Sequence, residues 1–270
     1  MRVILLGSTG SIGAATARAL AARGHDVVRF GRAGARDAAD LRIVDFSSAA
    51  SIAAQGFHGE RFDALISCMA SRTGAPADAW AVDHLAHIHA LDAARQAGVR
   101  HFTLLSAICV QRPQLAFQHA KLAFEAAPAA SGLNYSIVRP TAYFKSLAGQ
   151  FERVKRGRPF VMFGDGRLTA CKPISDSDLA DYLAESLTRE NRRNRILPIG
   201  GPGPAISPRG QGEMLFAALA MKPRFRSVPV ALLDAVIAGL DFAGRFAPNL
   251  REKAERARIG RYYATNRCSS

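Results

Sequence analysis

The sequence predicts an α/β fold built on a doubly wound parallel sheet, and three observations support this expectation. Short apolar runs alternate with stretches whose apolar residues recur at helical spacing. A glycine-rich turn joins the first run to the first helical stretch. Apolar residues make up 49% of the 270-residue chain, which is enough for a sizeable core.

The first strand–turn–helix unit lies at the start of the chain. The apolar run RVILLG (2–7) predicts a strand that ends in glycine. The following SIGAATARALAARG (11–24) has apolar residues at helical spacing and stops at Gly24. Further strand-like runs lie at 26–31, 41–46, 62–68, 101–107 and 134–140, with helical stretches near 77–97 and 114–131 between the later ones. Such alternation predicts a parallel sheet covered by helices on both faces.

The pattern becomes less regular after Pro140. Segments rich in glycine and proline, such as LPIGGPGPAISP (197–208), separate short strand candidates from the remaining helices. These helices are expected near 175–189, 207–220 and 229–246. We therefore expect residues 1–140 to form the sheet domain and residues 141–270 to form a smaller substrate-binding lobe that is not independent of it.

The turn GSTGSIG (7–13) carries the first functional signal. Gly7 permits a tight turn, Gly10 lets the backbone approach a pyrophosphate, and Gly13 lets the helix pack close to the strand. The N–H groups at the start of a helix favour negative charge. In this context the spacing predicts a Rossmann-like domain that binds a dinucleotide. The expected cofactor contacts are Gly7, Ser8, Thr9, Gly10, Ser11, Ile12 and Gly13.

The end of the second strand indicates which dinucleotide is bound. An acidic residue there would accept hydrogen bonds from the ribose hydroxyls of NAD. Here the chain reads FGRAGAR (30–36), with Arg32 and Arg36 and no carboxylate before Asp37. An arginine pairs well with a 2′-phosphate, so we expect NADPH as the cofactor and Arg32 as its phosphate ligand.

The formal net charge of +14 raises the question of nucleic-acid binding. The basic residues are spread along the chain and no nucleic-acid-binding motif is present. The nearest run, RENRRNR (189–195), lies at an expected helix end and is typical of a solvated terminus. We expect instead a general attraction for anions, such as a phosphorylated cofactor, a carboxylated substrate or acidic lipid headgroups.

The cysteines and the apolar segments indicate a cytoplasmic location. Cys68, Cys109, Cys171 and Cys268 have no CxxC spacing, which argues against a disulfide framework and a zinc site. No signal peptide is recognisable at Met1. The longest apolar stretch (228–244) is interrupted by two aspartates, so it is too short and too polar to span a bilayer. Peripheral contact with a membrane stays open.

The stretch FQHAK (117–121) raises a question about the chemistry. In a nucleotide-dependent reductase of this kind, a tyrosine normally precedes the lysine by four residues and protonates a carbonyl oxygen. Here that position is Phe117, and the lysine is Lys121. With the glycine turn and the strand order, the lysine makes the chain resemble an atypical member of the extended short-chain dehydrogenase/reductase family.

Within that family the resemblance becomes closer. The sequence is similar to the NADPH-dependent divinyl chlorophyllide 8-vinyl reductases in segments that cover most of the chain, and Phe117 is part of that similarity. The segments are SCMASRTG (67–74), LLSAICVQRP (104–113), FQHAKLAFE (117–125), YSIVRPTAYFKSLAGQ (135–150), PFVMFGDG (159–166), ACKPISDSDLA (170–180) and LPIGGPG (197–203). Plant relatives carry a chloroplast transit segment, so the first strand at the start of this chain implies a bacterial phototroph or a mature form.

The resemblance implies reduction of a vinyl substituent on a tetrapyrrole in chlorophyll or bacteriochlorophyll synthesis. Hydride delivery to a conjugated carbon spreads charge into the macrocycle, so no alkoxide forms and a tyrosine acid is dispensable. The resemblance also implies that Lys121 contacts the nicotinamide ribose and that Ser106 is a site serine, which makes these two the expected catalytic residues. The matched segments add Met69, Ala70, Pro140 and Thr141 as cofactor contacts.

Several residues have weaker functional interpretations. Tyr135 and Tyr143 are candidate proton donors, although tyrosines that flank a strand usually pack with the hydroxyl at the surface. Phe144, Phe160 and Phe163 are candidates for stacking on a macrocycle, and core packing explains them equally well. Of His84, His87 and His89 only the first two share a helix face and no third ligand follows, so no metal is expected. The candidates for holding a substrate carboxylate are Arg153, Lys155 and Arg156.

Two other functions stay open from the sequence alone. The first is an isoflavone-reductase-like enzyme that acts on another conjugated alkene. The second is a non-catalytic NADPH-binding regulator or pigment-protein assembly factor. The amphipathic stretch 228–246 is also ambiguous, because it fits closure over a pigment, which we favour, or docking on a bilayer.

Overall fold

The computed structural model describes residues 1–35, 41–144 and 148–266, which form two compact units. The first comprises Met1–Arg72, Pro76–Pro140 and Asp176–Ile199. The second comprises Thr73–Ala75, Thr141–Ser175 and the chain from Gly200 onward. The sequence predicts a sheet domain of residues 1–140 and a lobe of residues 141–270. In the structure two segments lie in the other unit, since Asp176–Ile199 belongs to the first unit and Thr73–Ala75 to the second.

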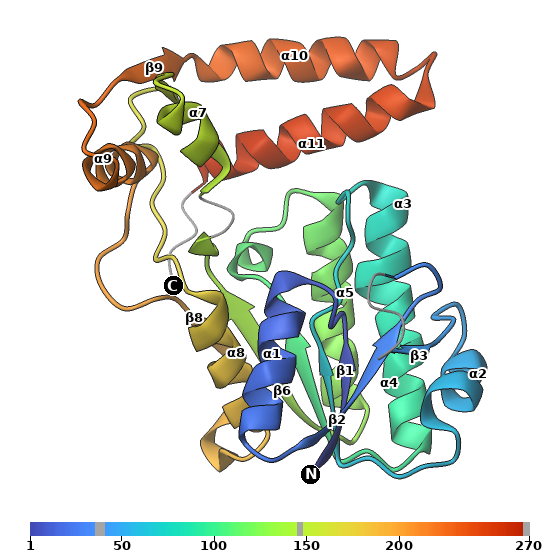
Figure 1. The fold of residues 1–270 in the computed structure, drawn as a ribbon. Coiled ribbons are helices and arrows are strands. Elements are labelled where there is room, and N and C mark those ends of the chain that lie inside the picture. The colour runs from blue at the N-terminus through green and yellow to red at the C-terminus, as the bar shows by residue number, and fades with distance from the viewer. Residues whose placement is uncertain (36–40, 145–147, 267–270) are drawn as a thin grey trace. The chain divides into compact units, whose positions relative to one another are not determined.

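The first unit contains the predicted parallel sheet (Figure 1). Its seven strands follow the order β3-β2-β1-β4-β5-β6-β8, and every neighbouring pair is parallel. The strands are β1 (Arg2–Leu6), β2 (Asp26–Gly31), β3 (Arg42–Ile43), β4 (Ala64–Ser67), β5 (His101–Leu105), β6 (Asn134–Pro140) and β8 (Arg195–Ile199). The chain runs from β1 outward to β3 and returns to β4 on the other side of β1. Ligands of such sheets bind at this reversal, outside the carboxyl ends of the strands.

Helices cover both faces of the sheet, as Figure 1 shows. The register of β1 explains how, because consecutive strand residues point to opposite faces. Ile4 and Leu6 belong to the core that packs on α4 and α5, whereas Val3 and Leu5 belong to the core that packs on α1 and α8. The helices are α1 (Ser11–Ala22), α2 (Ala49–Ser51), α3 (Pro76–Ala79), α4 (Ala86–Gln96), α5 (Ala116–Ala130) and α8 (Asp176–Glu185).

One π-helical turn extends helix α2, and another joins helices α3 and α4. Helix α2 continues into η2 (Ile52–Phe57), and η3 (Trp80–Leu85) joins α3 to α4 without a break. Short 3-10 turns also occur at η4 (Ile108–Gln111) and η6 (Glu190–Arg192). The turn η3 shifts the helical register in the middle of a helix that the sequence predicts as one regular stretch.

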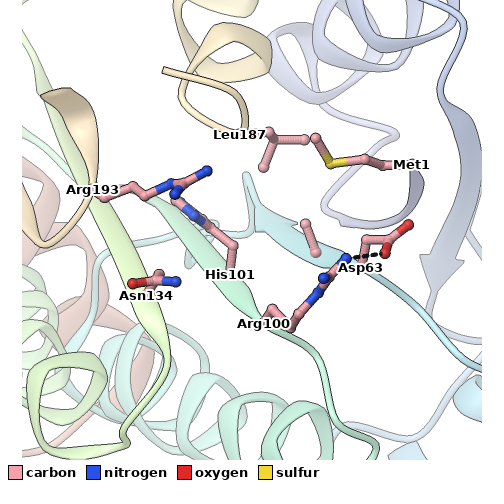
Figure 2. Close-up of a pocket in the computed structure, with 8 residues that line it drawn as sticks. Met1, Asp63, Arg100, His101, Asn134, Leu187 and Arg193 are labelled. Atoms are coloured by element: carbon pink, nitrogen blue, oxygen red, sulfur yellow. Dashed lines mark hydrogen bonds and ion pairs between the residues drawn. The ribbon is translucent and has the colours of Figure 1, made fainter. Parts of the chain in front are cut away.

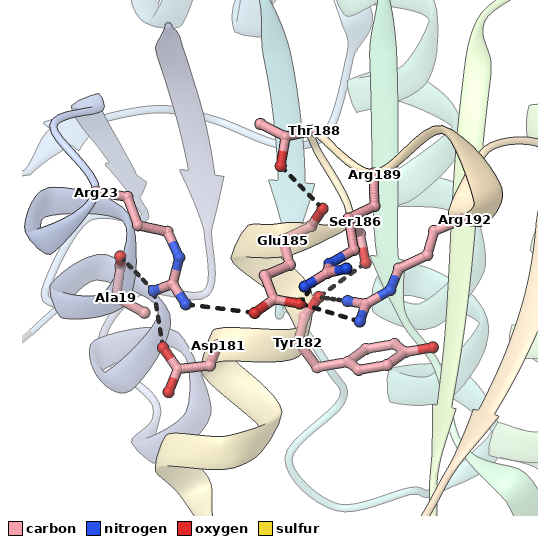
Figure 3. A network of polar contacts seen from close by, with 9 residues as sticks. All are labelled: Ala19, Arg23, Asp181, Tyr182, Glu185, Ser186, Thr188, Arg189 and Arg192. Carbon is pink, nitrogen blue, oxygen red and sulfur yellow. Dashed lines mark hydrogen bonds and ion pairs between the residues drawn. The ribbon is translucent and has the colours of Figure 1, made fainter.

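A polar network fastens α8 to α1 (Figure 3). Arg23 of α1 donates to Asp181 of α8 at 2.7 Å and lies 3.8 Å from Glu185. Glu185 also accepts from Arg192 at 3.1 Å. The Arg192 guanidinium stacks 3.6 Å from the ring centroid of Tyr182, where it makes a cation–π contact. With β8 paired to β6, this network explains why the segment 176–199 belongs to the first unit.

The second unit is built on a two-stranded parallel sheet of β7 (Phe160–Phe163) and β9 (Phe225–Val228). Its core contains Val154, Phe160, Met162 and Phe216. The helical elements are η5 (Ala148–Gln150), α7 (Phe151–Lys155), α9 (Pro208–Ala218), α10 (Val230–Ala243) and α11 (Pro248–Thr265). Helix α11 was not predicted from the sequence.

Helices α10 and α11 form a hairpin held by ion pairs. Arg258 pairs with Asp241 at 2.5 Å, and Arg261 pairs with Asp234. No helix in the described part of the chain is long and apolar enough to cross a bilayer. The three described cysteines form no disulfide with one another, and Cys268 lies outside the described residues.

Candidate cofactor-binding and catalytic site

The predicted site residues of the first unit follow the carboxyl ends of neighbouring parallel strands. Gly7 follows β1, Arg32 follows β2, Met69 lies just beyond β4 and Ser106 follows β5. Pro140 is the last residue of β6. Because all these strands are parallel, their carboxyl ends lie at one edge of the sheet, where α/β proteins bind their ligands.

Packing within the protein requires glycine at two positions of the turn. Gly7 has φ +73°, and a Cβ there would lie 2.6 Å from the backbone of Cys68 and Met69. A Cβ at Gly13 would lie 2.1 Å from the carbonyl oxygen of Gly7. Both glycines therefore allow close backbone approaches, one between the turn and the end of β4 and one between α1 and the turn.

Gly10 differs from these two glycines. A Cβ there would have only the Gly7 oxygen nearby, at 3.4 Å, so nothing in the protein itself requires glycine at this position. Gly10 is the N-cap of α1 and brings no capping side chain, and the first turn of α1 contains no acidic residue. The buried hydroxyl of Ser8 has no hydrogen-bond partner among the described residues. An exposed helix start of this kind fits a phosphate group.

The other residues of the turn divide between surface and core. Thr9 and Ser11 are exposed, whereas Ile12, in the first turn of α1, is buried. Arg32 is also exposed and begins a turn in which Ala35 donates to its carbonyl oxygen at 3.1 Å. Arg36 and Asp37 lie outside the described residues. The region after β2 thus presents Arg32 to solvent at the predicted cofactor edge.

A buried histidine orders the segment after β4. The Nδ1 atom of His87 donates to the carbonyl oxygen of Val82 at 2.8 Å, so its Nε2 accepts from the hydroxyl of Ser67, also at 2.8 Å. The Ser67 oxygen in turn accepts from the N–H of Met69 at 3.3 Å. Burial, and next the Lys121 ammonium, lower the pKa of His87 to about 4. His87 is therefore neutral and holds the backbone at Met69 in place, while the adjoining Ala70 is exposed.

Lys121 reaches the same segment through a buried aspartate. Its ammonium lies 2.9 Å from Oδ1 of Asp83, and both side chains are at least nine-tenths buried. The same Oδ1 accepts from the N–H of Ser71 at 3.2 Å. Lys121 thus lies beside the loop that contains Met69 and Ala70, which the sequence predicts as cofactor contacts.

Phe117 lies one turn before Lys121 on α5 and is half-buried. A residue pair at this spacing shares one helix face. The position that would carry a phenol in a carbonyl reductase therefore carries an apolar ring beside the buried lysine.

Ser106 belongs to a second buried polar group. Its hydroxyl donates to Glu125 of α5, and Glu125 also pairs with Arg139 of β6 through two donors of the guanidinium. All three residues are buried. The hydroxyl proton of Ser106 is thus already engaged, and the group joins β5, α5 and β6.

The remaining sequence-predicted candidates lie in different places. Thr141 belongs to the second unit and donates its hydroxyl to the carbonyl oxygen of Lys172. Tyr135 is the second residue of β6, so it lies toward the amino edge of the sheet, far from the strand ends that carry Ser106. Phe160 is a core residue of the second unit, and Phe144 is exposed. Tyr143 forms a backbone bridge with Ile174.

Each unit contains a pocket formed by its described residues. The pocket of the first unit has a volume of about 220 Å³ and lies at the amino ends of β4, β5 and β6. Its lining includes Asp63, Arg100, His101 and Arg193, with the Arg100–Asp63 ion pair at its rim (Figure 2). Burial, followed by the charge of Arg193, lowers the pKa of His101 to about 4. The second, of about 350 Å³, lies in the second unit and is lined by Met162, Phe163, Leu168, Thr169, Gln211 and Tyr263, among others.

Sequence reasoning missed the partners of the predicted catalytic residues. Asp83, His87, Glu125 and Arg139 are all buried charged or titratable residues, and their roles depend on contacts between distant segments. A weak signal was available for one of them, because Glu125 lies within a helix between apolar neighbours. The histidines at 84, 87 and 89 were assessed only for metal binding, and no group of three metal-binding side chains occurs in the described part of the chain.

Comparisons with known proteins support a nucleotide-binding domain and identify the family. A family described as NAD(P)H-binding matches residues 7–190. The chain is 48% identical to the chloroplastic divinyl chlorophyllide a 8-vinyl-reductase of Oryza sativa subsp. indica, covering 97% of this chain and 70% of the relative. It is 45% identical to the protein of that name from Arabidopsis thaliana, covering 98% of this chain and 68% of the relative.

Solved structures show the same fold at low sequence identity. A UDP-glucose 4-epimerase of Thermus thermophilus in complex with NAD has a TM-score of 0.70 at 20% identity, covering 85% of this chain and 86% of that one. An NADPH-dependent quinone oxidoreductase of Escherichia coli complexed with NADPH has a TM-score of 0.68 at 18% identity, covering 96% and 90%. The NAD(P)H-binding domain and the extensive identity to the plant reductases lead to one conclusion: this chain belongs to the divinyl chlorophyllide a 8-vinyl-reductase family.

Proposed function

We propose that this protein uses NADPH to reduce the 8-vinyl group of a divinyl chlorophyllide to an ethyl group. The observation that carries the proposal is identity of 45–48% to proteins named for this reaction, over 97–98% of the chain. The site geometry supports it, because the residues expected at the cofactor follow the carboxyl ends of β1, β2, β4, β5 and β6.

The residues of the first unit would hold the cofactor as follows. The exposed helix start at Gly10 receives the pyrophosphate, and Arg32 pairs with the 2′-phosphate. The ordered segment at Met69 and the ammonium of Lys121 contact the nicotinamide end. When bound, the reduced nicotinamide supplies a hydride to one vinyl carbon, while a proton is added to the other.

Phe117 is compatible with this chemistry. Charge that develops during reduction of a conjugated vinyl group spreads into the macrocycle and does not collect on one oxygen. The buried ammonium of Lys121 stabilises such charge electrostatically, without a phenolic acid beside it. The proton of Ser106 already engages Glu125, so we assign Ser106 to holding β5 and α5 in position within the site.

The second unit is proposed to bind the tetrapyrrole. Its pocket is lined mainly by apolar and aromatic side chains, with Gln150, Thr169 and Gln211 as polar groups, which suits a flat, largely apolar pigment. Lys155 and Arg156 are exposed on α7 and just beyond it, and are available for a substrate carboxylate. Arg153 donates to the carbonyl oxygen of Pro159 and is less available.

The activity is tested directly with purified protein, divinyl chlorophyllide and NADPH. Loss of the 8-vinyl group shifts the pigment's absorbance, and chromatography identifies the ethyl product. Reduction of an unrelated conjugated alkene but not of the pigment would instead support the isoflavone-reductase-like alternative. NADPH binding without turnover of either substrate would support a non-catalytic role.

The preference for NADPH over NADH is tested at Arg32. Because a guanidinium pairs with the 2′-phosphate that NADH lacks, Arg32→Ala should raise the KM for NADPH by about tenfold or more and leave the KM for NADH nearly unchanged. Arg29→Ala, which removes an arginine from β2 just before Arg32, is the control. Equal losses with both cofactors would show that Arg32 only supports the fold.

We also propose that helix α10 makes peripheral contact with the photosynthetic membrane, which is the alternative to the closure over a pigment that the sequence favours for 228–246. None of its residues is buried, and Leu232 and Phe242 are 55% and 63% exposed. Both acidic residues of α10 are paired with arginines of α11, while Arg224 and Arg226 in and beside β9 are exposed and basic. An apolar face flanked by positive charge suits an anionic bilayer. The test is whether the protein sediments with anionic vesicles. The double variant Leu232→Ser/Phe242→Ser should lose this binding, and equal binding of the wild type to neutral vesicles would contradict the charge argument.

A further inference from the structure

Asp83 occupies an unusual place in the fold. It lies in the π-helical turn η3, in the middle of the continuous helix 76–96. Turns of this kind are uncommon inside helices and often mark functional sites. Asp83 and His87, four residues apart, both contact the segment at the end of β4, through Ser71 and Ser67 respectively.

The Asp83 carboxylate joins two parts of the proposed cofactor site. One oxygen, Oδ1, lies 2.9 Å from the Lys121 ammonium and accepts from the Ser71 N–H at 3.2 Å. The other oxygen, Oδ2, is buried and has no hydrogen-bond partner among the described residues. All the observed contacts of the carboxylate therefore run to the lysine and to the loop that follows Met69 and Ala70.

Stability alone is a poor explanation for this pair. Asp83 is 1% exposed and Lys121 8% exposed, so both charges are removed from water. Desolvation of a buried ion pair commonly offsets most of its Coulomb attraction, and apolar replacements are often as stable. An ion pair buried beside a ligand site instead fixes the position of its cation.

We propose that Asp83 is a positioning residue that fixes the ammonium of Lys121 against the loop after β4, so that the lysine is in place when the cofactor binds. This inference rests on the proposed role of Lys121 at the cofactor. Asp83 acts through Lys121 and does not itself touch the cofactor or the pigment. His87 orders the same loop independently, through Ser67.

The protein contains a control that makes the same kinds of contact as Asp83 but is more exposed, with 34% of its side chain accessible against 0% for Asp83. Asp63 also combines an ion pair, to Arg100 at 2.7 Å, with acceptance of a backbone N–H, from Arg2 at 2.8 Å. It belongs to the same unit but lies just before β4, at the amino edge of the sheet. Asp63→Asn therefore removes the same charge in the same kind of contact, away from the proposed cofactor site.

The test compares Asp83→Asn, Lys121→Met, the double variant and Asp63→Asn in the full-length protein. NADPH affinity is measured by the fluorescence of the bound nucleotide, kcat and KM by pigment reduction, and folding by thermal unfolding. Asp83→Asn should weaken NADPH binding about tenfold and lower kcat, Lys121→Met should do at least as much, and the double variant should match Lys121→Met. Asp63→Asn should bind NADPH as the wild type does.

Two results would overturn the proposal. One is a folded Asp83→Asn variant with wild-type NADPH affinity and kcat. The other is a further loss when Asp83→Asn is added to Lys121→Met, because Asp83 would then act independently of the lysine. If Asp83→Asn alone does not fold, the comparison of Lys121→Met with the double variant still tests the proposal. Neither of these two variants contains the lysine whose charge Asp83→Asn would leave unpaired.

The nucleotide titration separates this inference from the proposed function. NADPH binding needs no pigment, so the positioning role remains testable if the wild type reduces no vinyl group. Wild-type NADPH affinity and turnover in Lys121→Met would refute the proposed role of the lysine by itself, whatever Asp83 does.

Discussion

Gly10 and Gly13 form a natural pair for testing how the turn binds the cofactor. The same substitution, glycine to alanine, should have opposite consequences at the two positions. At Gly13 the new methyl would lie 2.1 Å from the Gly7 oxygen and 2.8 Å from the Ser8 Cα, both backbone atoms that cannot move aside. We expect Gly13→Ala to cost about 3 kcal/mol of stability through overpacking.

At Gly10 the methyl meets only the Gly7 oxygen, at 3.4 Å, and the backbone there has φ −77° and ψ 163°, which any residue adopts. The cost to folding is that of alanine at a helix N-cap, about 0.5–1 kcal/mol. The methyl would, however, hold the pyrophosphate away from the helix start. Losing one hydrogen bond to a charged group costs roughly 1.5–3 kcal/mol, which corresponds to a roughly 10- to 100-fold rise in Kd.

The assay combines thermal unfolding without cofactor and fluorescence titration with NADPH. Gly10→Ala should unfold within a few degrees of the wild type and bind NADPH weakly. Gly13→Ala should unfold at a much lower temperature. A Gly10→Ala variant with the wild-type Kd would refute the placement of the pyrophosphate at this helix start.

Three further outcomes are expected. Phe117→Tyr should give no gain in turnover, because no oxygen of the substrate requires the phenolic proton. Lys121→Ala should lower kcat by roughly 100-fold. A large acceleration of pigment reduction in Phe117→Tyr would contradict this chemistry. The apparent affinity for the pigment should fall with added salt if basic groups hold its carboxylate, and an unchanged affinity would indicate a purely apolar pocket. The pKa values of His87 and His101 are lowered from 6.5 to about 4 in the folded protein, so the unfolded chain binds more protons between these values. Stability should therefore fall as the pH drops from about 6.5 to about 4, by up to roughly 3 kcal/mol per histidine, and His101→Gln should flatten this dependence in thermal unfolding.

The sequence predicted the elements whose signals are local. The run 2–7, the glycine turn and the first helix form β1, the turn and α1 nearly as expected, because apolar periodicity and glycine spacing act within a few residues. Helix α11 was missed since it is polar around most of its circumference. Its contacts with α10 include the ion pairs of Arg258 and Arg261, which the sequence presents as ordinary surface charges.

In the candidate site, the sequence identifies the glycines and the lysine as candidates but not the groups that contact them. Lys121 stood at a recognisable spacing after Phe117. Its partner Asp83 is 38 positions earlier in the chain and lies in the π-helical turn η3, which the sequence did not predict. The pairing of Ser106 with Glu125 and Arg139 likewise depends on how β5, α5 and β6 assemble. Periodicity carries no information about such long-range contacts.

The return of segment 176–199 to the first unit determines how the protein can be cut. A fragment ending at residue 140 would lack β8. Strand β6 would then be an edge strand, with the backbone groups that β8 pairs left exposed, and such edges promote aggregation. It would also lose Ala184 and Leu187, which cover Leu20 and the neighbouring apolar face of the sheet. During synthesis the sheet is incomplete until residue 199 has emerged from the ribosome. By then the segment Thr141–Ser175 of the second unit has already been made. The nucleotide-binding half therefore cannot be obtained by a single cut at its apparent boundary, and the shortest continuous piece that keeps every strand of the sheet is 1–199.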